Sequence, residues 1–217
     1  MRLVATAISK GSGGSALPET SLEMVSGRAL LTEMETEQRP TVLSLIVSGR
    51  MKPSTGSVTI DGSASRRELR RNIAIVDAPD VSEPHGDVRF ADVVAEELMF
   101  AGRMPSPWAV RNWLEEHQMS GYARVPMGQL APEMRVRALA ELALLREGVT
   151  GLILVSPDRH GRDPFGWWRV ATELAARDVA VLVLAGVASA ALIRGAAANA
   201  ERGANPASEA NSEGPTK

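Results

Sequence analysis

Residues 34–41, with the sequence METEQRPT, lie where phosphate chemistry is expected. An apolar run at residues 29–31 precedes this segment, and a helix-like stretch at residues 40–47 overlaps its end. Further along, Val58 and Ile60 alternate with polar residues as in a strand. Strand, loop, helix and strand in this order form the frame that holds a phosphate-binding loop.

The side chains of this segment are poorly suited to such chemistry. A phosphate-binding loop uses glycines to let successive backbone N–H groups converge on phosphate, and a lysine adds positive charge. Residues 34–41 contain neither glycine nor lysine, and Glu35 and Glu37 add negative charge. A carboxylate about 4 Å from a phosphate charge costs on the order of several kcal/mol at intermediate dielectric. Arg39 would offset part of this cost, and Thr41 offers a hydroxyl to a metal ion.

Residues 43–62, LSLIVSGRMKPSTGSVTIDG, resemble the passage after the Walker A loop in the nucleotide-binding subunits of ATP-binding cassette (ABC) transporters. The shared positions are Ser48, Gly49, Pro53, Gly56, Val58 and Gly62. Counting back places the Walker A octet on residues 34–41. The family has glycine, glycine, glycine and lysine where this chain has Met34, Glu37, Arg39 and Pro40, so only Thr41 matches. The resemblance implies that these residues would hold ATP: Met34, Glu35, Thr36, Glu37, Gln38, Arg39, Pro40 and Thr41, with Thr41 also reaching Mg²⁺.

The family's signature segment has a counterpart at residues 130–144, LAPEMRVRALAELAL. Its helical half agrees, and Arg135 and Arg137 align with arginines of the family. Residues 131–133, Ala-Pro-Glu, replace the Ser-Gly-Gly that contacts a γ-phosphate on the opposite subunit. Without the resemblance, Pro132 and Glu133 are simply favourable residues for the start of a helix.

Three further motifs of the family's catalytic pattern differ. Ala78 stands where a glutamine contacts magnesium and water, residues 155–157 read Val-Ser-Pro in place of Asp-Glu-Pro, and Gly186 replaces the switch histidine. Asp163 resembles an aspartate that the family has in a loop after the Asp-Glu-Pro positions, and it is a candidate for nucleotide contact. The loss of all these groups together argues against ATP hydrolysis.

The resemblance extends over roughly residues 1–190 and implies an α/β fold. We expect a P-loop NTPase-like core with a mostly parallel sheet, an N-terminal antiparallel β layer and a helical sub-domain. The predicted domain spans residues 1–195, with the sub-domain at about 79–145 and a disordered tail at 196–217. Residues 3–8 are predicted to form an edge strand.

Residues 88–100 and 108–118 have helical character, and we expect Trp108 and Trp113 to be packing anchors of the helical sub-domain. This sub-domain is the part of the family that docks the membrane subunit. The three histidines share no metal-ligand spacing, which favours surface or loop roles over metal binding.

Composition limits the other possibilities. The chain of 217 residues is 44% hydrophobic, which suffices for a substantial core. Its net charge of −2 gives no strong case for nucleic acid or an anionic membrane, and without cysteine it has neither disulfides nor thiolate metal sites. No membrane span or signal peptide is recognisable. We expect a cytoplasmic protein, at most peripheral at the inner face of the cell membrane.

Three interpretations stay open at this stage. In the first, the chain is a degenerate ABC subunit, a pseudo-ATPase that supports a membrane permease or a sister subunit. In the second, Thr41, Arg39 and Asp163 contribute to a divergent ATP site that a partner completes. In the third, the chain is an unrelated α/β enzyme, which a different strand order would favour.

Overall fold

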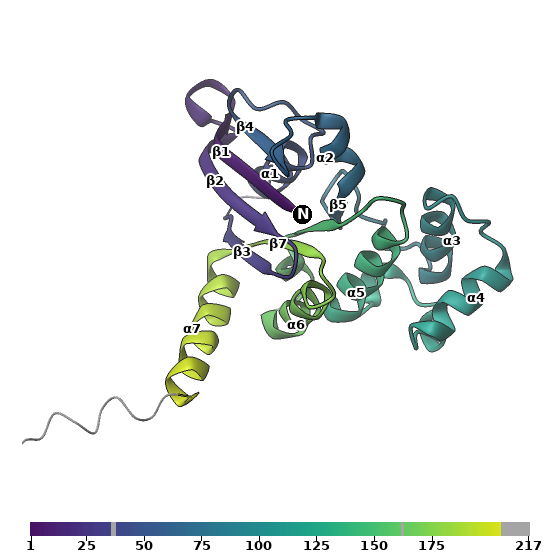
Figure 1. Cartoon of the computed structure of the whole chain (residues 1–217). Coiled ribbons are helices and arrows are strands. Elements are labelled where there is room, and N and C mark those ends of the chain that lie inside the picture. Colours follow the sequence, from purple (N-terminus) through teal and green to yellow (C-terminus); the bar gives the residue numbers. More distant parts are fainter. Residues whose placement is uncertain (36–37, 162, 205–217) are drawn as a thin grey trace, which may run out of the picture.

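Two sheets and seven helices make up the computed structural model of the chain, which describes residues 1–35, 38–161 and 163–204 (Figure 1). The antiparallel sheet has the order β2-β1-β4 and contains β1 (Arg2–Lys10), β2 (Leu17–Val25) and β4 (Thr55–Ile60). The second sheet is parallel throughout, in the order β3-β7-β6-β5. Its strands are β3 (Ala29–Glu33), β5 (Ile73–Val76), β6 (Gly151–Val155) and β7 (Ala180–Ala185).

The parallel sheet is buried on both faces. Every residue of β5, β6 and β7 is buried, which explains why these strands read as continuous apolar runs. Successive side chains point to opposite faces. Leu152 and Leu154 therefore join one hydrophobic cluster, while Ile153 and Val155 join the other.

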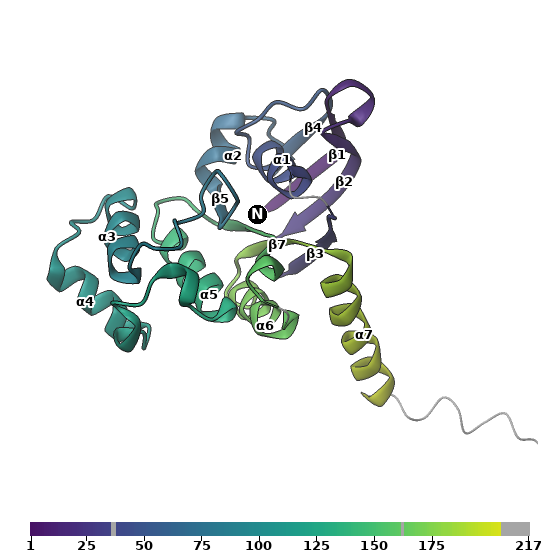
Figure 2. The same cartoon turned by 180° about the vertical axis from the view of Figure 1, so that it is seen from behind.

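Helices cover both faces of this sheet. They are α1 (Gln38–Val47), α2 (Arg66–Asn72), α3 (Phe90–Phe100), α4 (Pro107–Glu116), α5 (Pro132–Leu144), α6 (Pro164–Ala175) and α7 (Val187–Ala204). The antiparallel sheet and α1 share one hydrophobic cluster with the parallel sheet, and α3 to α6 contribute to the other. Figures 1 and 2 show α3 and α4 reaching out beyond the sheet, away from α7.

Prolines at helix starts agree with the expected chemistry. Pro107, Pro132 and Pro164 each begin a helix, where the missing N–H has no intrahelical use. Helix α1 begins at Gln38, two residues before the expected start, so Pro40 is its third residue. This position is tolerated because none of the first four N–H groups of a helix has an acceptor within the helix.

The predicted fold class is confirmed, with three local corrections. Strand β1 lies in the middle of its sheet and not at the edge. Trp113 is buried at 3% exposure, but Trp108 is 70% exposed and is not a packing anchor. Residues 196–204 continue helix α7 and do not belong to a disordered tail; the rest of that predicted tail, 205–217, lies outside the described residues. The proposed boundaries at 195 and at 79–145 stay predictions.

Candidate functional site

The segment predicted to bind ATP joins β3 to α1, as the frame requires. Met34 donates its backbone N–H to the carbonyl of Ala185 at 2.9 Å and packs against a hydrophobic cluster. Glu35 is exposed, and Thr36 and Glu37 lie outside the described residues.

The remainder of the octet forms the first turn of α1. Gln38 and Arg39 open the helix, and Pro40 is buried. The carbonyl of Thr41 accepts a hydrogen bond from the Ser44 hydroxyl at 2.7 Å. Pro40 occupies the position of the family's phosphate-binding lysine. Its side chain is a buried ring without charge, and its backbone has no N–H.

A group of charged side chains surrounds a buried ion pair at the carboxyl ends of β5 and β6, and we name it the Asp77 cluster. Its members are Asp77, Glu83, Arg135, Arg159 and His160. Asp77 directly follows β5, Arg135 is on α5, and the Arg159–His160 pair belongs to the short turn after β6. Asp77 and Arg135 are 3% and 2% exposed.

Asp77 and Arg135 form a bidentate ion pair. Arg135 Nε donates to Asp77 Oδ2 at 2.9 Å, and Arg135 Nη2 donates to Asp77 Oδ1 at 2.7 Å. The third nitrogen of the guanidinium, Nη1, donates to the Met127 carbonyl at 3.0 Å. Such two-fold contacts between planar groups are among the stronger protein hydrogen bonds, and here they connect a helix to a strand end.

The turn after β6 adds two more contacts to the same carboxylate. His160 Nε2 lies 2.9 Å from Asp77 Oδ2, and Arg159 Nη2 lies 3.2 Å from Asp77 Oδ1. Glu83 then completes the cluster, because its Oε1 is 3.2 Å from Arg159 Nη2 and 3.7 Å from Arg135 Nη2. Two guanidinium groups thus balance two carboxylates.

The pKa of the Asp77 carboxyl shows which effect dominates. Burial alone raises this pKa, since a charge in the interior loses its hydration. The hydrogen bonds from His160 and Arg135, with the charges of Arg135 and Arg159, outweigh burial and hold the pKa far below its usual value of 3.8. Asp77 is therefore ionised in the folded protein.

Backbone strain accompanies this arrangement. Asp77 has φ of +57° and Ser156 has φ of +47°, so the residues that follow two neighbouring strands both adopt the left-handed conformation. Residues other than glycine seldom do so without a compensating contact. Arg159 supplies one, because its Nη1 donates to the carbonyl of Val155 at 2.7 Å and to that of Ser156 at 3.3 Å.

A second carboxylate, Asp158, ties the same turn to β7. Its Oδ2 accepts a hydrogen bond from the backbone N–H of Gly186 at 2.9 Å. A Cβ atom at Gly186 would lie 3.0 Å from this oxygen, which is unusually tight. Glycine at the family's histidine position therefore accommodates an internal contact.

Asp163 caps a helix in this structure, and its predicted contact with a nucleotide stays a prediction. Its carboxylate accepts the backbone N–H of Phe165 at 2.9 Å and caps the N-terminus of α6. The structure does not bring Asp163 into the Asp77 cluster.

The residues present do not fit a magnesium-bound triphosphate. Where the family has lysine and glycine, the octet has a buried proline and a partly buried methionine that packs against the core. By the same resemblance, Val155, at 1% exposure, stands in place of the magnesium ligand. Asp77, Glu83 and His160 have ligand atoms within 4.8 Å of one another, a spacing that suits a metal ion. Arg135 and Arg159 already neutralise both carboxylates, so a cation would add uncompensated positive charge.

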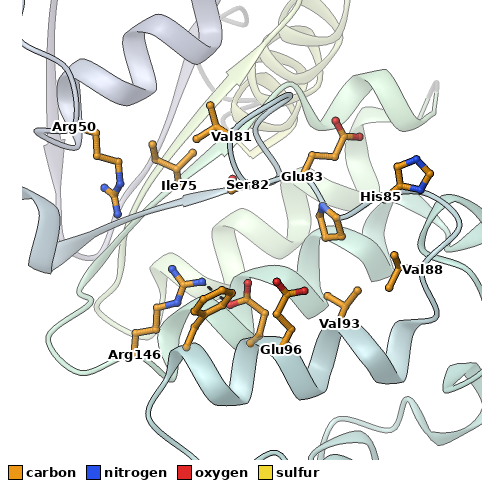
Figure 3. Close-up of a pocket in the computed structure, with 13 residues that line it drawn as sticks. Arg50, Ile75, Val81, Ser82, Glu83, His85, Val88, Val93, Glu96 and Arg146 are labelled. Atoms are coloured by element: carbon orange, nitrogen blue, oxygen red, sulfur yellow. Dashed lines mark hydrogen bonds and ion pairs between the residues drawn. The ribbon is translucent and has the colours of Figure 1, made fainter.

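A groove of about 660 Å³ opens beside the cluster, between β5, the loop after it and α3 (Figure 3). Arg50 and Arg146 lie at one end of it, and Glu83 and His85 lie at the other. Arg146 pairs with Glu97 on α3 and lies over the ring of Phe100 at 5.7 Å. Glu83 belongs to both the groove and the Asp77 cluster.

Solved structures of the same fold come from ABC transporters. No family model matches the sequence, and no curated protein matches it either. A dimeric bacterial ABC transporter cassette superposes with a TM-score of 0.61 and 17% identity, over 84% of this chain and 87% of its own. A putative ABC transporter ATP-binding protein from Pyrococcus furiosus superposes with a TM-score of 0.59 and 14% identity, over 86% of this chain and 92% of its own. A subunit of an ABC transporter complex from Clostridium perfringens superposes with a TM-score of 0.56 and 20% identity, over 85% of this chain and 77% of its own.

At these identities the likeness establishes the architecture. This chain has the fold of the ATP-binding cassettes of ABC transporters, with their parallel core, antiparallel layer and helical sub-domain. No helix among the described residues is long and apolar enough to cross a membrane.

Proposed function

We propose that this chain is an ABC-type subunit that does not hydrolyse ATP by itself and serves a membrane permease or a sister subunit as a structural or regulatory partner. The observation that carries the proposal is the Asp77 cluster. Its side chains come from the end of β5, the turn after β6 and helix α5. By resemblance, these are the places that supply the glutamine, the magnesium ligand and the signature helix of an active cassette.

The cluster replaces a ligand-dependent connection by an internal one. Arg135 brings α5 to the core through Asp77, and both groups are almost fully buried. Removing one partner of such a pair is costly, because the other charge is left buried and unpaired. The helical sub-domain is thereby held to the core without nucleotide.

The groove supports the partner role. It is lined by apolar side chains such as Ile75, Val81 and Val93, with charged groups at its ends. Burial, together with the charges of Arg146 and Arg70, lowers the pKa of Arg50, so an acidic residue of a partner would be favourable there. The similar structures include a subunit of a transporter complex and a dimeric cassette. A permease segment in this groove would place the chain at the inner face of the cell membrane.

Two measurements test the catalytic half of the proposal. Purified chain with millimolar Mg-ATP is expected to release no phosphate above a no-protein control. Its thermal unfolding is expected to be the same with and without Mg-ATP, whereas a ligand at 100 times its Kd adds about 2.7 kcal/mol of stability. Turnover by the isolated chain that requires Thr41 would instead establish an active, divergent site.

A matched pair of variants tests the partner half. Val81→Glu places a charge in the groove at a side chain that is 45% exposed, and Val187→Glu makes the same change on α7 at 41% exposure. Recovery of a permease with the detergent-solubilised native chain is expected to fall with Val81→Glu and to persist with Val187→Glu. Equal recovery with both variants would exclude the groove as the docking site.

A further inference from the structure

The turn between α3 and α4 displays an unusual concentration of apolar surface. Among the described residues, the four most exposed large hydrophobic side chains all lie within residues 99–108. They are Met104 at 80% exposure, Trp108 at 70%, Phe100 at 59% and Met99 at 56%. Exposed apolar groups that gather in one place mark interaction sites far more often than single ones do.

The backbone keeps Met104 and Trp108 exposed, at 80% and 70%. Gly102 adopts φ of +72° after α3, and Ser106 caps α4 by accepting the N–H of Ala109 at 3.1 Å. The inward face of α4 is already filled by Val110, Trp113 and Leu114. Trp108 lies on another face of the helix and finds no place in the core.

The charge of this segment has one sign. No Asp or Glu occurs from residue 98 to residue 114, and the two charged residues there, Arg103 and Arg111, are both exposed. Within residues 99–108 Arg103 is the only charged residue, and the nearest acidic residues in the sequence are Glu96 and Glu97 before the turn and Glu115 and Glu116 after Arg111. Figures 1 and 2 show that the turn between α3 and α4 lies at an outer end of the molecule, and we name residues 99–108 the tip.

We infer that this turn, residues 99–108, is a membrane-contact site that inserts Met104 and Trp108 into the interfacial region of an anionic bilayer. Tryptophan prefers that region because its ring is apolar and its N–H is polar. Each arginine near an anionic surface adds electrostatic attraction, and its apolar stem lies easily along the boundary. A projecting tip with aromatic, thioether and guanidinium groups suits a soft, negatively charged surface better than a rigid protein pocket.

The site adjoins the proposed docking groove without depending on it. Phe100 belongs to both the tip and the groove lining. Binding of the tip to lipid needs no permease. Vesicles that contain lipid alone therefore test this inference separately from the proposed function.

The experiment is sedimentation of the full chain with vesicles of phosphatidylcholine and phosphatidylglycerol, compared with vesicles of phosphatidylcholine alone. The native chain is expected to bind the anionic vesicles more tightly. Trp108→Ser is expected to weaken this binding by about tenfold, because a large apolar side chain no longer leaves water. Arg103→Gln is expected to reduce the preference for anionic lipid by about fivefold.

Phe165→Ser is the control, since Phe165 is an exposed aromatic residue (47%) on α6, outside the tip. It is expected to bind as the native chain does. Absence of binding to either vesicle, or equal binding by Trp108→Ser and the native chain, would overturn the inference. Concentration-dependent self-association that Trp108→Ser abolishes would also overturn it, because a second copy would then cover the tip.

Discussion

Replacing Asp77 by asparagine removes one charge from the centre of the cluster and keeps the size of the side chain. The variant leaves Arg135, at 2% exposure, facing an amide, and it weakens the contacts of His160 and Arg159 with the same position. Arg135, Arg159 and His160 therefore lose part of their pairing at once.

The expected loss is large because both partners are buried. Breaking a buried ion pair by removing one side costs about 3–5 kcal/mol, since the desolvated partner is left without its counter-charge. For a protein of this size, this corresponds to a fall in Tm of about 6–20 °C. Neutralising both partners, as in Asp77→Asn with Arg135→Met, is expected to recover much of the loss, because no buried charge then lacks a partner and asparagine tolerates the φ of +57° at position 77.

Urea unfolding monitored by circular dichroism measures these differences. Glu147→Gln is a suitable control, because Glu147 pairs with Arg71 at 3.3 Å but its side chain is 94% exposed. That variant is expected to unfold at the same urea concentration as the native chain. A change in unfolding free energy below about 1 kcal/mol for Asp77→Asn would show that the cluster is not a buried ion pair.

Further tests concern pH, packing and backbone geometry. Because the folded pKa of Asp77 lies below its unfolded value of 3.8, its stabilisation is complete above that pH and declines below it. The stability difference between native chain and Asp77→Asn should shrink by about 1.4 kcal/mol per pH unit as acid is added. Trp113→Ala is expected to lower the free energy of unfolding in urea by about 3–5 kcal/mol, and Trp108→Ala by under about 0.5 kcal/mol. The reason is that, of the two, only Trp113 is buried, where it packs edge-on against the ring of Phe90 with the ring centroids 6.2 Å apart. Equal costs for the two variants would contradict this packing. Gly56→Ala should lower Tm at least twice as much as Gly62→Ala, since both have positive φ but only at Gly56 would a Cβ lie 2.3 Å from a backbone carbonyl.

The fold was predicted from the family resemblance, and local patterns agreed with it. Continuous apolar runs such as residues 151–155 indicate strands buried on both faces, and prolines mark the starts of α4 and α5. Which side of a helix is buried was harder to predict. Trp108 and Trp113 belong to one amphipathic helix, but its inward side depends on what α3 and the following loop provide.

The Asp77 cluster could not be predicted from the sequence in the same way. Asp77 and Arg135 are separated by 58 positions, and His160 lies 83 positions from Asp77. No short motif relates these residues, because only the parallel pairing of β5 with β6 brings their carboxyl ends together. The available signal was indirect: the family's glutamine, glutamate and aspartate positions were all replaced, and Arg135 was one of two arginines retained on the signature helix.

Equilibrium dialysis of the native chain against labelled ATP with Mg²⁺ addresses the core of this account most directly. The internal ion pairs and the lysine-free first turn of α1 predict equal ATP concentrations on both sides of the membrane, for the native chain and for Thr41→Ala alike. Saturable binding of one ATP per chain that Thr41→Ala abolishes would mean that residues 34–41 still hold a triphosphate, and the account would be wrong.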